Sequence, residues 1–316
     1  MKKIFITGGT GFFGISMLRF LQENKLYNNY SLYLLTRNIL KFKSRCPKSI
    51  DLSNVNFFEG NILDPSSFPK NIFNYVIHAA TDSTAGLELN HIDRSEQIVN
   101  GTRNILEWCK KTHVKRFLFI SSGGVYGSIN KPVFEYENVC PSISNIDNTY
   151  SISKIFSEHL CFLYASRYNF SISVARCFSF IGKDLPKDAH FAIGNFLGDV
   201  IKDKSITIKG DGNPIRSFMD QDDLANWLFT ILFFGKANEI YNVGSDEEIS
   251  IKNLAELIKK IFKSNVKIDL KNKKITGQSS KRNYYVPNID KAKKELNLNL
   301  NFSLKDSISK ISSSYK

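Results

Sequence analysis

A tyrosine and a lysine stand four residues apart in residues 148–154, which read NTYSISK. Side chains at positions i and i+4 lie on one face of a helix, so Tyr150 and Lys154 are expected to be neighbours. A nearby ammonium favours the phenolate and lowers the pKa of a phenol from about 10 toward neutrality. The pair is therefore a candidate acid or base for proton transfer, and a solvated turn of helix is the alternative.

A serine pair ends the apolar run at residues 114–122, VKRFLFISS. A hydroxyl at the carboxyl end of that predicted strand could hydrogen-bond the substrate oxygen that gains or loses the proton. Ser122 is the candidate, with Ser121 beside it. A tyrosine and lysine at this spacing are common on surfaces by chance. In this chain the tyrosine and lysine come after the predicted strand that ends in Ser121 and Ser122, and after a glycine-rich turn near the start of the sequence. In that context they indicate a catalytic set of Ser122, Tyr150 and Lys154.

The glycine turn is the stretch TGGTGFFG at residues 7–14, between a predicted strand and a predicted helix. Gly8 would permit the tight turn, Gly11 would let a pyrophosphate approach the backbone, and Gly14 would let the helix pack on the strand. Any strand–helix turn uses glycine, so the pattern alone is weak evidence. Its context between a strand and a helix predicts a dinucleotide site.

The end of the second predicted strand, LLTRN, bears on the choice of cofactor. NAD sites usually place a carboxylate there for the ribose 2′-hydroxyl. This chain has Arg37 instead, which could pair with a 2′-phosphate. NADP(H) is therefore favoured and NAD is not excluded. The alternative is that Arg37 stacks on adenine or faces solvent.

Alternating strands and helices must position these groups. The sequence predicts helices at 14–25, 98–113 and 148–168, and strands at 2–7, 30–36, 55–62, 74–80, 114–122 and 170–178. This rhythm is typical of an α/β fold, a Rossmann-type doubly wound parallel sheet. After residue 178 the rhythm loosens. We expect residues 1–178 to form the dinucleotide-binding domain and 179–316 mainly a smaller α/β substrate-binding lobe, with some strands returning to the first domain.

Composition excludes several other classes of protein. The share of hydrophobic residues is 42% and the share of charged residues 23%, as in ordinary globular proteins. No apolar run reaches the roughly 18–20 residues that cross a bilayer. Five scattered cysteines without a CxxC pair indicate reduced thiols and a cytoplasmic protein. The five histidines show no metal-ligand spacing, so no metal is expected.

The net charge of +13 raises the possibility of nucleic-acid binding. The basic residues are spread out, and their clusters are typical of solvated faces. A nucleic-acid site would need basic residues interleaved with stacking aromatics on one face, whereas this sequence offers a glycine turn for a phosphate. We therefore expect neither a nucleic-acid nor a membrane partner. A diffuse positive field favours anionic small molecules instead.

Together these motifs resemble the extended short-chain dehydrogenase/reductases of the NAD-dependent epimerase/dehydratase type, which act on nucleotide sugars. The resemblance extends over nearly the whole chain, through TGGTGFFG, HAAT (78–81), VNGT (99–102), SSGGVYG (121–127), YSISK (150–154), GDGNPIRSFMDQDDLA (210–225) and YNVGS (241–245). It implies a nucleotide-diphosphate sugar as substrate. Further cofactor contacts are expected at Thr10, Phe12, Phe13, Asn61, Ile62, Ala79, Ala80, Thr81, Asn100, Tyr150, Lys154 and Cys177. Substrate contacts are expected at Ser122, Gly123, Tyr126, Ser179, His190, Asn195, Arg216 and Arg282.

Departures from the family pattern narrow the reaction. Dehydratases of this type carry an Asp–Glu pair after the catalytic hydroxyl, where this chain has Gly123 and Gly124. Elimination of water, and the related decarboxylation of sugar acids, are therefore not expected. Asn61 replaces a frequent aspartate that contacts adenine, and Ser179 replaces an asparagine that contacts the substrate phosphate. His190 is as well explained by a surface position as by a site role.

The remaining chemistry takes place at one sugar carbon. The chain is expected to be a 4-ketoreductase of a 4-keto-6-deoxy nucleotide sugar, with a nucleotide-sugar 4-epimerase as the alternative. The alternative from a different functional class is a dinucleotide-binding module without catalytic activity. The complete set of acid and base groups argues against that alternative. The resemblance also implies a homodimer through a four-helix interface, to which residues 98–109 and 154–168 would contribute apolar surface.

Overall fold

A computed structural model describes residues 1–25, 29–81, 89–112, 114–168, 170–187, 191–271 and 283–315. Its main sheet has seven strands in the order β11-β6-β5-β4-β1-β2-β3, and every pairing in it is parallel. The strands are β1 (Lys2–Thr7), β2 (Tyr30–Thr36), β3 (Val55–Glu59), β4 (Tyr75–His78), β5 (Arg116–Ser122), β6 (Ser171–Cys177) and β11 (Glu239–Val243). The predicted α/β doubly wound parallel sheet is confirmed.

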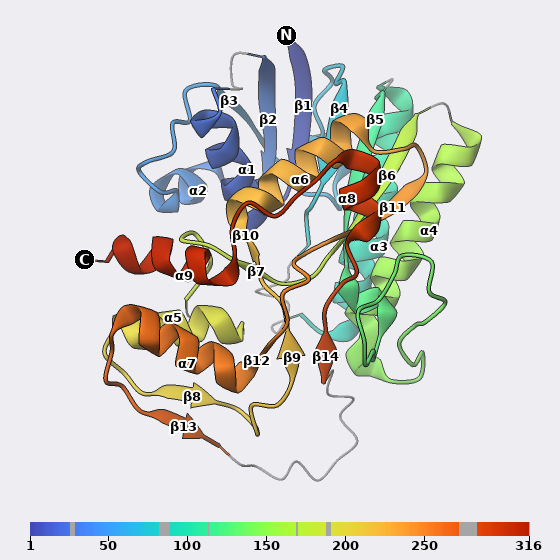
Figure 1. The fold of residues 1–316 in the computed structure, drawn as a ribbon. Helices are drawn as coiled ribbons and strands as arrows, with labels where there is room; N and C mark the ends of the chain where they lie inside the picture. Colours follow the sequence, from blue (N-terminus) through green and yellow to red (C-terminus); the bar gives the residue numbers. More distant parts are fainter. Residues whose placement is uncertain are drawn as a thin grey trace.

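Helices cover both faces of this sheet (Figure 1). One face carries α1 (Phe12–Glu23), α2 (Ile39–Arg45), α6 (Gln221–Phe234) and α8 (Asp290–Leu296), and the other carries α3 (His91–Lys111) and α4 (Thr149–Arg167). Strands buried on two faces are apolar almost throughout, and Ile4, Phe5 and Ile6 are at most 1% exposed. Short 3₁₀ turns lie at Pro65–Ser67, Gly123–Tyr126 and Ile146–Asn148.

A second group of elements forms a lobe with its own hydrophobic core. It contains α5 (Ala192–Ile201), α7 (Ile251–Phe262), α9 (Leu304–Ser313) and the parallel pair of β8 (Ile206–Ile208) with β13 (Ile268–Leu270). A small sheet joins β9 (Ile215–Arg216) to β12 (Ile249–Ser250) and β14 (Tyr284–Tyr285), and β7 (Phe180–Ile181) pairs with β10 (Met219–Asp220). In Figure 1 the lobe lies below the main sheet, at the ends where the strands finish.

The chain after residue 178 does not all belong to the lobe. β11 pairs with β6 and completes the main sheet, and α6 packs against α1. The expected boundary at residue 178 allowed for strands beyond it that join the sheet of the first domain, as β11 does. In the part of the chain that is described, no helix combines the length and the apolar character needed to cross a bilayer.

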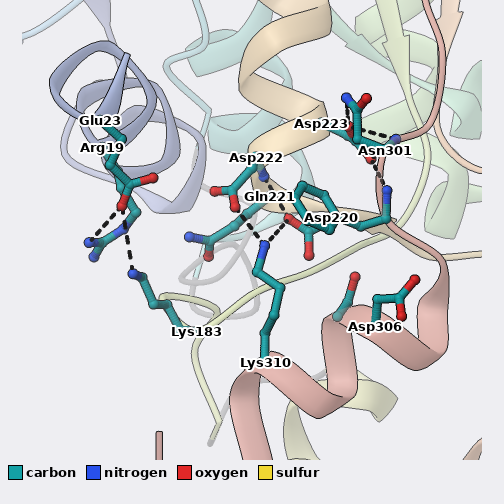
Figure 2. Close-up of polar contacts among 12 residues, drawn as sticks. Arg19, Glu23, Lys183, Asp220, Gln221, Asp222, Asp223, Asn301, Asp306 and Lys310 are labelled. Atoms are coloured by element: carbon teal, nitrogen blue, oxygen red, sulfur yellow. Dashed lines mark hydrogen bonds and ion pairs between the residues drawn. The ribbon is translucent and has the colours of Figure 1, made fainter. Parts of the chain in front are cut away.

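Polar contacts fix the lobe against the sheet (Figure 2). Lys310 on α9 donates to Asp222 at 2.7 Å and lies 3.5 Å from Asp220, which caps α6. Asp223 accepts from the backbone N–H of Asn301 and, at 2.7 Å, from its side chain. These contacts join the first turn of α6 to α9 and to the chain that enters α9.

A buried ion pair makes a second connection. The guanidinium of Arg19 on α1 binds both carboxylate oxygens of Asp184 at 2.9 Å, and Gln221 donates to the same carboxylate at 3.1 Å. Bidentate pairs of this kind are strong and geometrically specific. The segment after β7 is thereby held against the helix that begins at the glycine turn.

Candidate active site

The catalytic tyrosine candidate lies at the start of α4, beside the carboxyl end of β5. Tyr150 is half-buried, and the hydroxyl of Ser122 hydrogen-bonds its phenol. Ser122 also accepts from the backbone N–H of Gly124 at 3.1 Å, which fixes the start of the turn after β5. Cys177, at the end of β6, is an electrostatic neighbour of Tyr150. The structure therefore brings together groups from three separate elements, as a shared strand edge requires.

Lys154 lies one turn further along α4 and is 3% exposed. Its ammonium donates to the backbone carbonyl of Ile120 at 2.8 Å and to the hydroxyl of Thr81 at 2.9 Å. Its nitrogen is 5.9 Å from the centroid of the Tyr150 ring. The lysine thus ties α4 to the ends of β4 and β5.

The electrostatics differ from the sequence-based expectation. Burial raises the pKa of Tyr150 to about 12, although Ser122 and Arg94 act to lower it. Burial also lowers the pKa of Lys154 to about 8. The expectation that Lys154 brings the phenol toward neutrality is therefore wrong for this structure. Spacing along a helix reveals proximity, whereas desolvation, which disfavours the charged form of each group, depends on burial.

A buried ion pair joins β6, the neighbour of β5 in the sheet, to α4. Arg176 on β6 donates to Glu158 on α4 at 2.7 Å, and the side chains of the two residues are 13% and 5% exposed. Glu158 also accepts a short hydrogen bond from Ser121, the residue before Ser122. The carboxylate therefore connects α4, β5 and β6, one turn along α4 from Lys154.

The glycine turn has the geometry that a pyrophosphate requires. Gly8 has a φ of +75°, and a Cβ there would lie 2.5 Å from the backbone carbon of Ala79. A Cβ at Gly14 would lie 2.0 Å from the backbone oxygen of Gly9. Gly11 caps α1 without a side-chain hydrogen bond, and the first turn of α1 carries no acidic residue. Uncapped N–H groups at a helix N-terminus favour an anion, so these residues fit the phosphates of a dinucleotide.

The other cofactor candidates lie around this turn. Thr10, Phe12 and Phe13 are half-buried, as are Ala79, Ala80 and Thr81 at the end of β4. Arg37 is exposed at the end of β2. Asn61 follows β3, and its side-chain oxygen accepts from the backbone N–H of Leu63 at 3.1 Å. Ile62 is buried and Asn100 is exposed on α3.

Two glycine substitutions separate folding from dinucleotide binding. A Cβ at Gly11 would meet only the backbone oxygen of Gly8, at 3.6 Å, so Gly11→Ala should fold normally and melt within about 2 °C of wild type. We expect it to weaken dinucleotide binding by about tenfold or more, because the methyl group occupies the approach to the backbone. Gly14→Ala should lose both stability and binding, since its Cβ overlaps Gly9. Calorimetric titration with NAD and NADPH measures both effects, and wild-type affinity in Gly11→Ala would remove the phosphate site from this turn.

A cavity of about 1020 Å³ lies in the lobe, where residues of α5, β8, β9 and α7 line it together with Ser179. It contains three of the predicted substrate residues, Ser179, Asn195 and Arg216. Ser179 follows two residues after Cys177 in the sequence, whereas Ser122, Tyr150 and Lys154 do not line the cavity. The other residues that line it are Phe191, Ala192, Phe196, Thr207, Ile208, Lys209, Gly210, Asp211, Gly212, Pro214, Phe218, Ile251 and Asn283.

Three predicted substrate residues that the structure describes, Ser122, Gly123 and Tyr126, do not line this cavity. Tyr126 is 1% exposed, and its hydroxyl donates to the side chain of Asn242 at 2.8 Å. Gly123 is buried under the ring of Phe178, which would lie 2.7 Å from a Cβ at that position. Arg282 and His190, both also predicted, lie outside the described residues.

Sequence reasoning missed several residues that the structure places at the site. Phe191 and Lys209 line the cavity without belonging to a recognisable motif. Arg94 on α3 covers the ring of Tyr150, with its Cζ atom 4.9 Å from the ring centroid. Nothing in the local sequence around Arg94 indicates that contact, because it depends on how α3 packs beside α4.

Comparison with protein families gives a match over residues 4–244 to the family described as "NAD dependent epimerase/dehydratase family". The chain is 30% identical over 286 residues to a dTDP-D-glucose 4,6-dehydratase of Dictyostelium discoideum, covering 82% of this chain and 62% of the relative. It is 29% identical over 259 residues to a putative UDP-glucose 4-epimerase of Methanocaldococcus jannaschii, covering 81% of each protein.

Solved structures with the same fold include enzymes of both kinds. A UDP-glucuronic acid 4-epimerase mutant of Bacillus cereus, in complex with a UDP-sugar and NAD, superimposes with a TM-score of 0.84 at 24% identity, over 99% of this chain and 98% of that one. A dTDP-glucose 4,6-dehydratase of Bacillus anthracis with NAD has a TM-score of 0.84 at 22% identity, over 100% of this chain and 96% of that one.

Proposed function

Because this chain belongs to the NAD-dependent epimerase/dehydratase family, we propose that it is a nicotinamide-dependent oxidoreductase acting at C4 of a nucleotide sugar. We propose further that it reduces the ketone of a 4-keto-6-deoxy nucleotide sugar. One observation carries the proposal: Ser122 hydrogen-bonds Tyr150 where β5 ends, directly before a glycine pair.

The glycine pair supports a reaction confined to C4. Gly123 and Gly124 stand where the dehydratases of this family carry an acid and a base. The ring of Phe178 fills the space that a side chain at Gly123 would need. No carboxylate is present at either position to remove a proton from C5 or to protonate a leaving hydroxyl.

The protonation of Tyr150 supports a role as proton donor. With its pKa raised to about 12 by burial, the phenol keeps its proton near neutral pH and can act as an acid. When bound, a reduced nicotinamide dinucleotide supplies the hydride that reduces the C4 carbonyl. Tyr150 gives its proton to the C4 oxygen, Ser122 hydrogen-bonds that oxygen, and Lys154 holds the ends of β4 and β5 in place.

The proposed choice of NADP(H) over NAD rests on the residue at the end of β2. Arg37 is exposed at the end of β2, in the position that faces the adenosine ribose in sheets of this kind. Its charge supports NADP(H), which usually carries reducing power, and the glycine turn accepts the pyrophosphate of NAD equally well. Similar solved structures contain NAD, so NAD is compared with NADP and NADPH in the substrate panel.

A 4-epimerase is the second candidate. Proteins named as 4-epimerases are similar to this chain over 81–99% of its length. The same residues would serve, except that Tyr150 would first remove the proton of the C4 hydroxyl. An epimerase needs the same proton donation by Tyr150 in its second half-reaction, so the pKa of Tyr150 does not separate the two candidates.

A panel of nucleotide sugars and their 4-keto derivatives, each with NAD, NADP and NADPH, tests the proposal. Net loss of NADPH absorbance with a 4-keto sugar supports the reductase. Inversion at C4 without net change in the cofactor replaces it with the epimerase. Formation of a 4-keto-6-deoxy sugar from the hydroxyl sugar would mean elimination of water and would contradict the argument from the glycine pair.

We also propose a homodimer that works in the cytoplasm. Ile92 on α3 and Phe156 and Leu163 on α4 are 77%, 49% and 49% exposed, which supports helix pairing between two copies. Sedimentation showing only monomers would contradict the dimer. The described cysteines are free thiols, as a reducing compartment requires. No nucleic-acid partner is proposed, and filter binding at low salt checks this.

A further inference from the structure

Arg94 has an environment that packing alone does not explain. It lies in the first turn of α3, and its guanidinium covers the ring of Tyr150, with Cζ 4.9 Å from the centroid. Its Nε atom is buried and has no hydrogen-bond partner. Among the described residues no ion pair of Arg94 is found, and Asp93, its neighbour in the sequence, accepts from the side chain of Asn90. A buried donor without a partner is rare, and in a native structure it often marks a functional group.

The other groups around Tyr150 leave Arg94 as the cation best placed to act on it. Ser122 from β5 hydrogen-bonds the phenol, while Tyr285 from β14 and Cys177 from β6 oppose its ionisation. Lys154 faces it from α4, but its ammonium binds Ile120 and Thr81 and lies 5.9 Å from the ring centroid. A cation over an aromatic face attracts the π electrons, and it attracts the phenolate more strongly because the ring then carries negative charge.

We propose that Arg94 acts through Tyr150, as the cation that stabilises the phenolate formed when Tyr150 gives its proton to the substrate. In that step the O–H bond of Tyr150 breaks and an O–H bond forms at the C4 oxygen. The negative charge moves onto the phenol ring, where the guanidinium offsets it. The inference rests on the proposed role of Tyr150 as an acid, and it deepens that role by naming a second charged residue that it needs.

A titration that needs no substrate tests this directly. Difluorotyrosine is placed at position 150 in the full-length protein, because fluorine brings the ionisation of the phenol into a range where the protein stays folded. The ¹⁹F resonance then reports the ionisation of this one residue. We expect Arg94→Gln to move the inflection upward by about one pH unit. Arg94→Lys, which keeps the charge, should leave it near the wild-type value.

Lys110 provides the matched control. It lies on the same helix and its nitrogen is 4.8 Å from the centroid of a different ring, that of Tyr168. Lys110→Gln should not move the resonance at position 150. Thermal melting of each variant identifies any that is unfolded, and if Arg94→Gln does not fold, Arg94→Met replaces it, because it also removes the charge.

Kinetics with unmodified Tyr150 give the second measurement. Arg94→Gln should lower kcat for ketone reduction by about tenfold at neutral pH, with KM little changed. An unmoved ¹⁹F inflection in Arg94→Gln would overturn the inference, as would a change confined to KM, which would make Arg94 a binding group for an anionic part of the substrate. A shifted inflection in a protein that reduces no keto sugar would leave Arg94 assigned and remove the proposed reaction.

Discussion

Tyr150→Phe is expected to lower kcat for ketone reduction by about 10²–10⁴-fold, because the substitution removes the proton donor. The ring that Arg94 covers is kept, so the packing between α3 and α4 should not change. The affinity for the dinucleotide should also stay within about twofold of wild type, since the glycine turn is untouched. Steady-state kinetics with a 4-keto-6-deoxy nucleotide sugar and NADPH measure the first effect, and fluorescence titration with NADPH measures the second.

Tyr168→Phe is the control, because Tyr168 caps the opposite end of α4 from the site. It should retain wild-type kcat. Retention of more than about a tenth of the activity in Tyr150→Phe would mean that another group donates the proton, and the assignment of Tyr150 would then fail.

Breaking the buried ion pair between Glu158 and Arg176 is expected to have the largest effect on stability. Glu158→Gln should lower the free energy of unfolding by about 3–5 kcal/mol, because it leaves the buried charge of Arg176 without a counter-charge. It should also lower activity, since Ser121, next to Ser122, loses its charged acceptor. Urea denaturation followed by circular dichroism measures the loss of stability.

An exposed ion pair serves for comparison. Lys294 and Asp290 on α8 lie 3.7 Å apart with side chains 78% and 50% exposed, so Lys294→Gln should cost less than about 0.5 kcal/mol. Combining Glu158→Gln with Arg176→Met removes both buried charges and should restore part of the stability. A loss below about 1 kcal/mol in Glu158→Gln alone would show that water or a rearranged neighbour satisfies Arg176, contrary to the structure.

The sheet could be predicted because its strands have a strong local pattern. Short apolar and aromatic runs such as YSLYLLT appear as strands, most of them within two residues of their predicted bounds. The strand predicted at 55–62 ends three residues early, at Glu59. α6 was missed for the opposite reason. Its sequence QDDLANWLFTILFF is apolar around most of its circumference, because it packs against α1 as well as the sheet, so the helical period is weak. β11 was seen only as the motif YNVGS, since five residues cannot reveal which sheet they join.

The candidate site was predicted as a set of residue types, but not as an electrostatic environment. The positions of Ser122, Tyr150 and Lys154 follow from a helix and a strand that meet at one sheet edge. The ionisation of Tyr150 depends on burial, on Tyr285 and on Arg94, which come from elements far away in the sequence. The environment of Tyr126 could not be predicted for the same reason. Its hydroxyl donates a hydrogen bond to Asn242, which lies far away in the sequence.

Transfer of a labelled hydride gives the most direct test of the central claim, that Tyr150 protonates a C4 oxygen while C4 gains hydrogen from the dinucleotide. A 4-keto-6-deoxy nucleotide sugar is incubated with NADPH that carries deuterium at the transferable position, and the product is analysed by mass spectrometry and NMR. We expect one deuterium at C4 for each NADPH oxidised, with a rate of transfer about 10²–10⁴-fold lower in Tyr150→Phe. Consumption of the sugar without deuterium at C4, or equal transfer by Tyr150→Phe, would contradict the account.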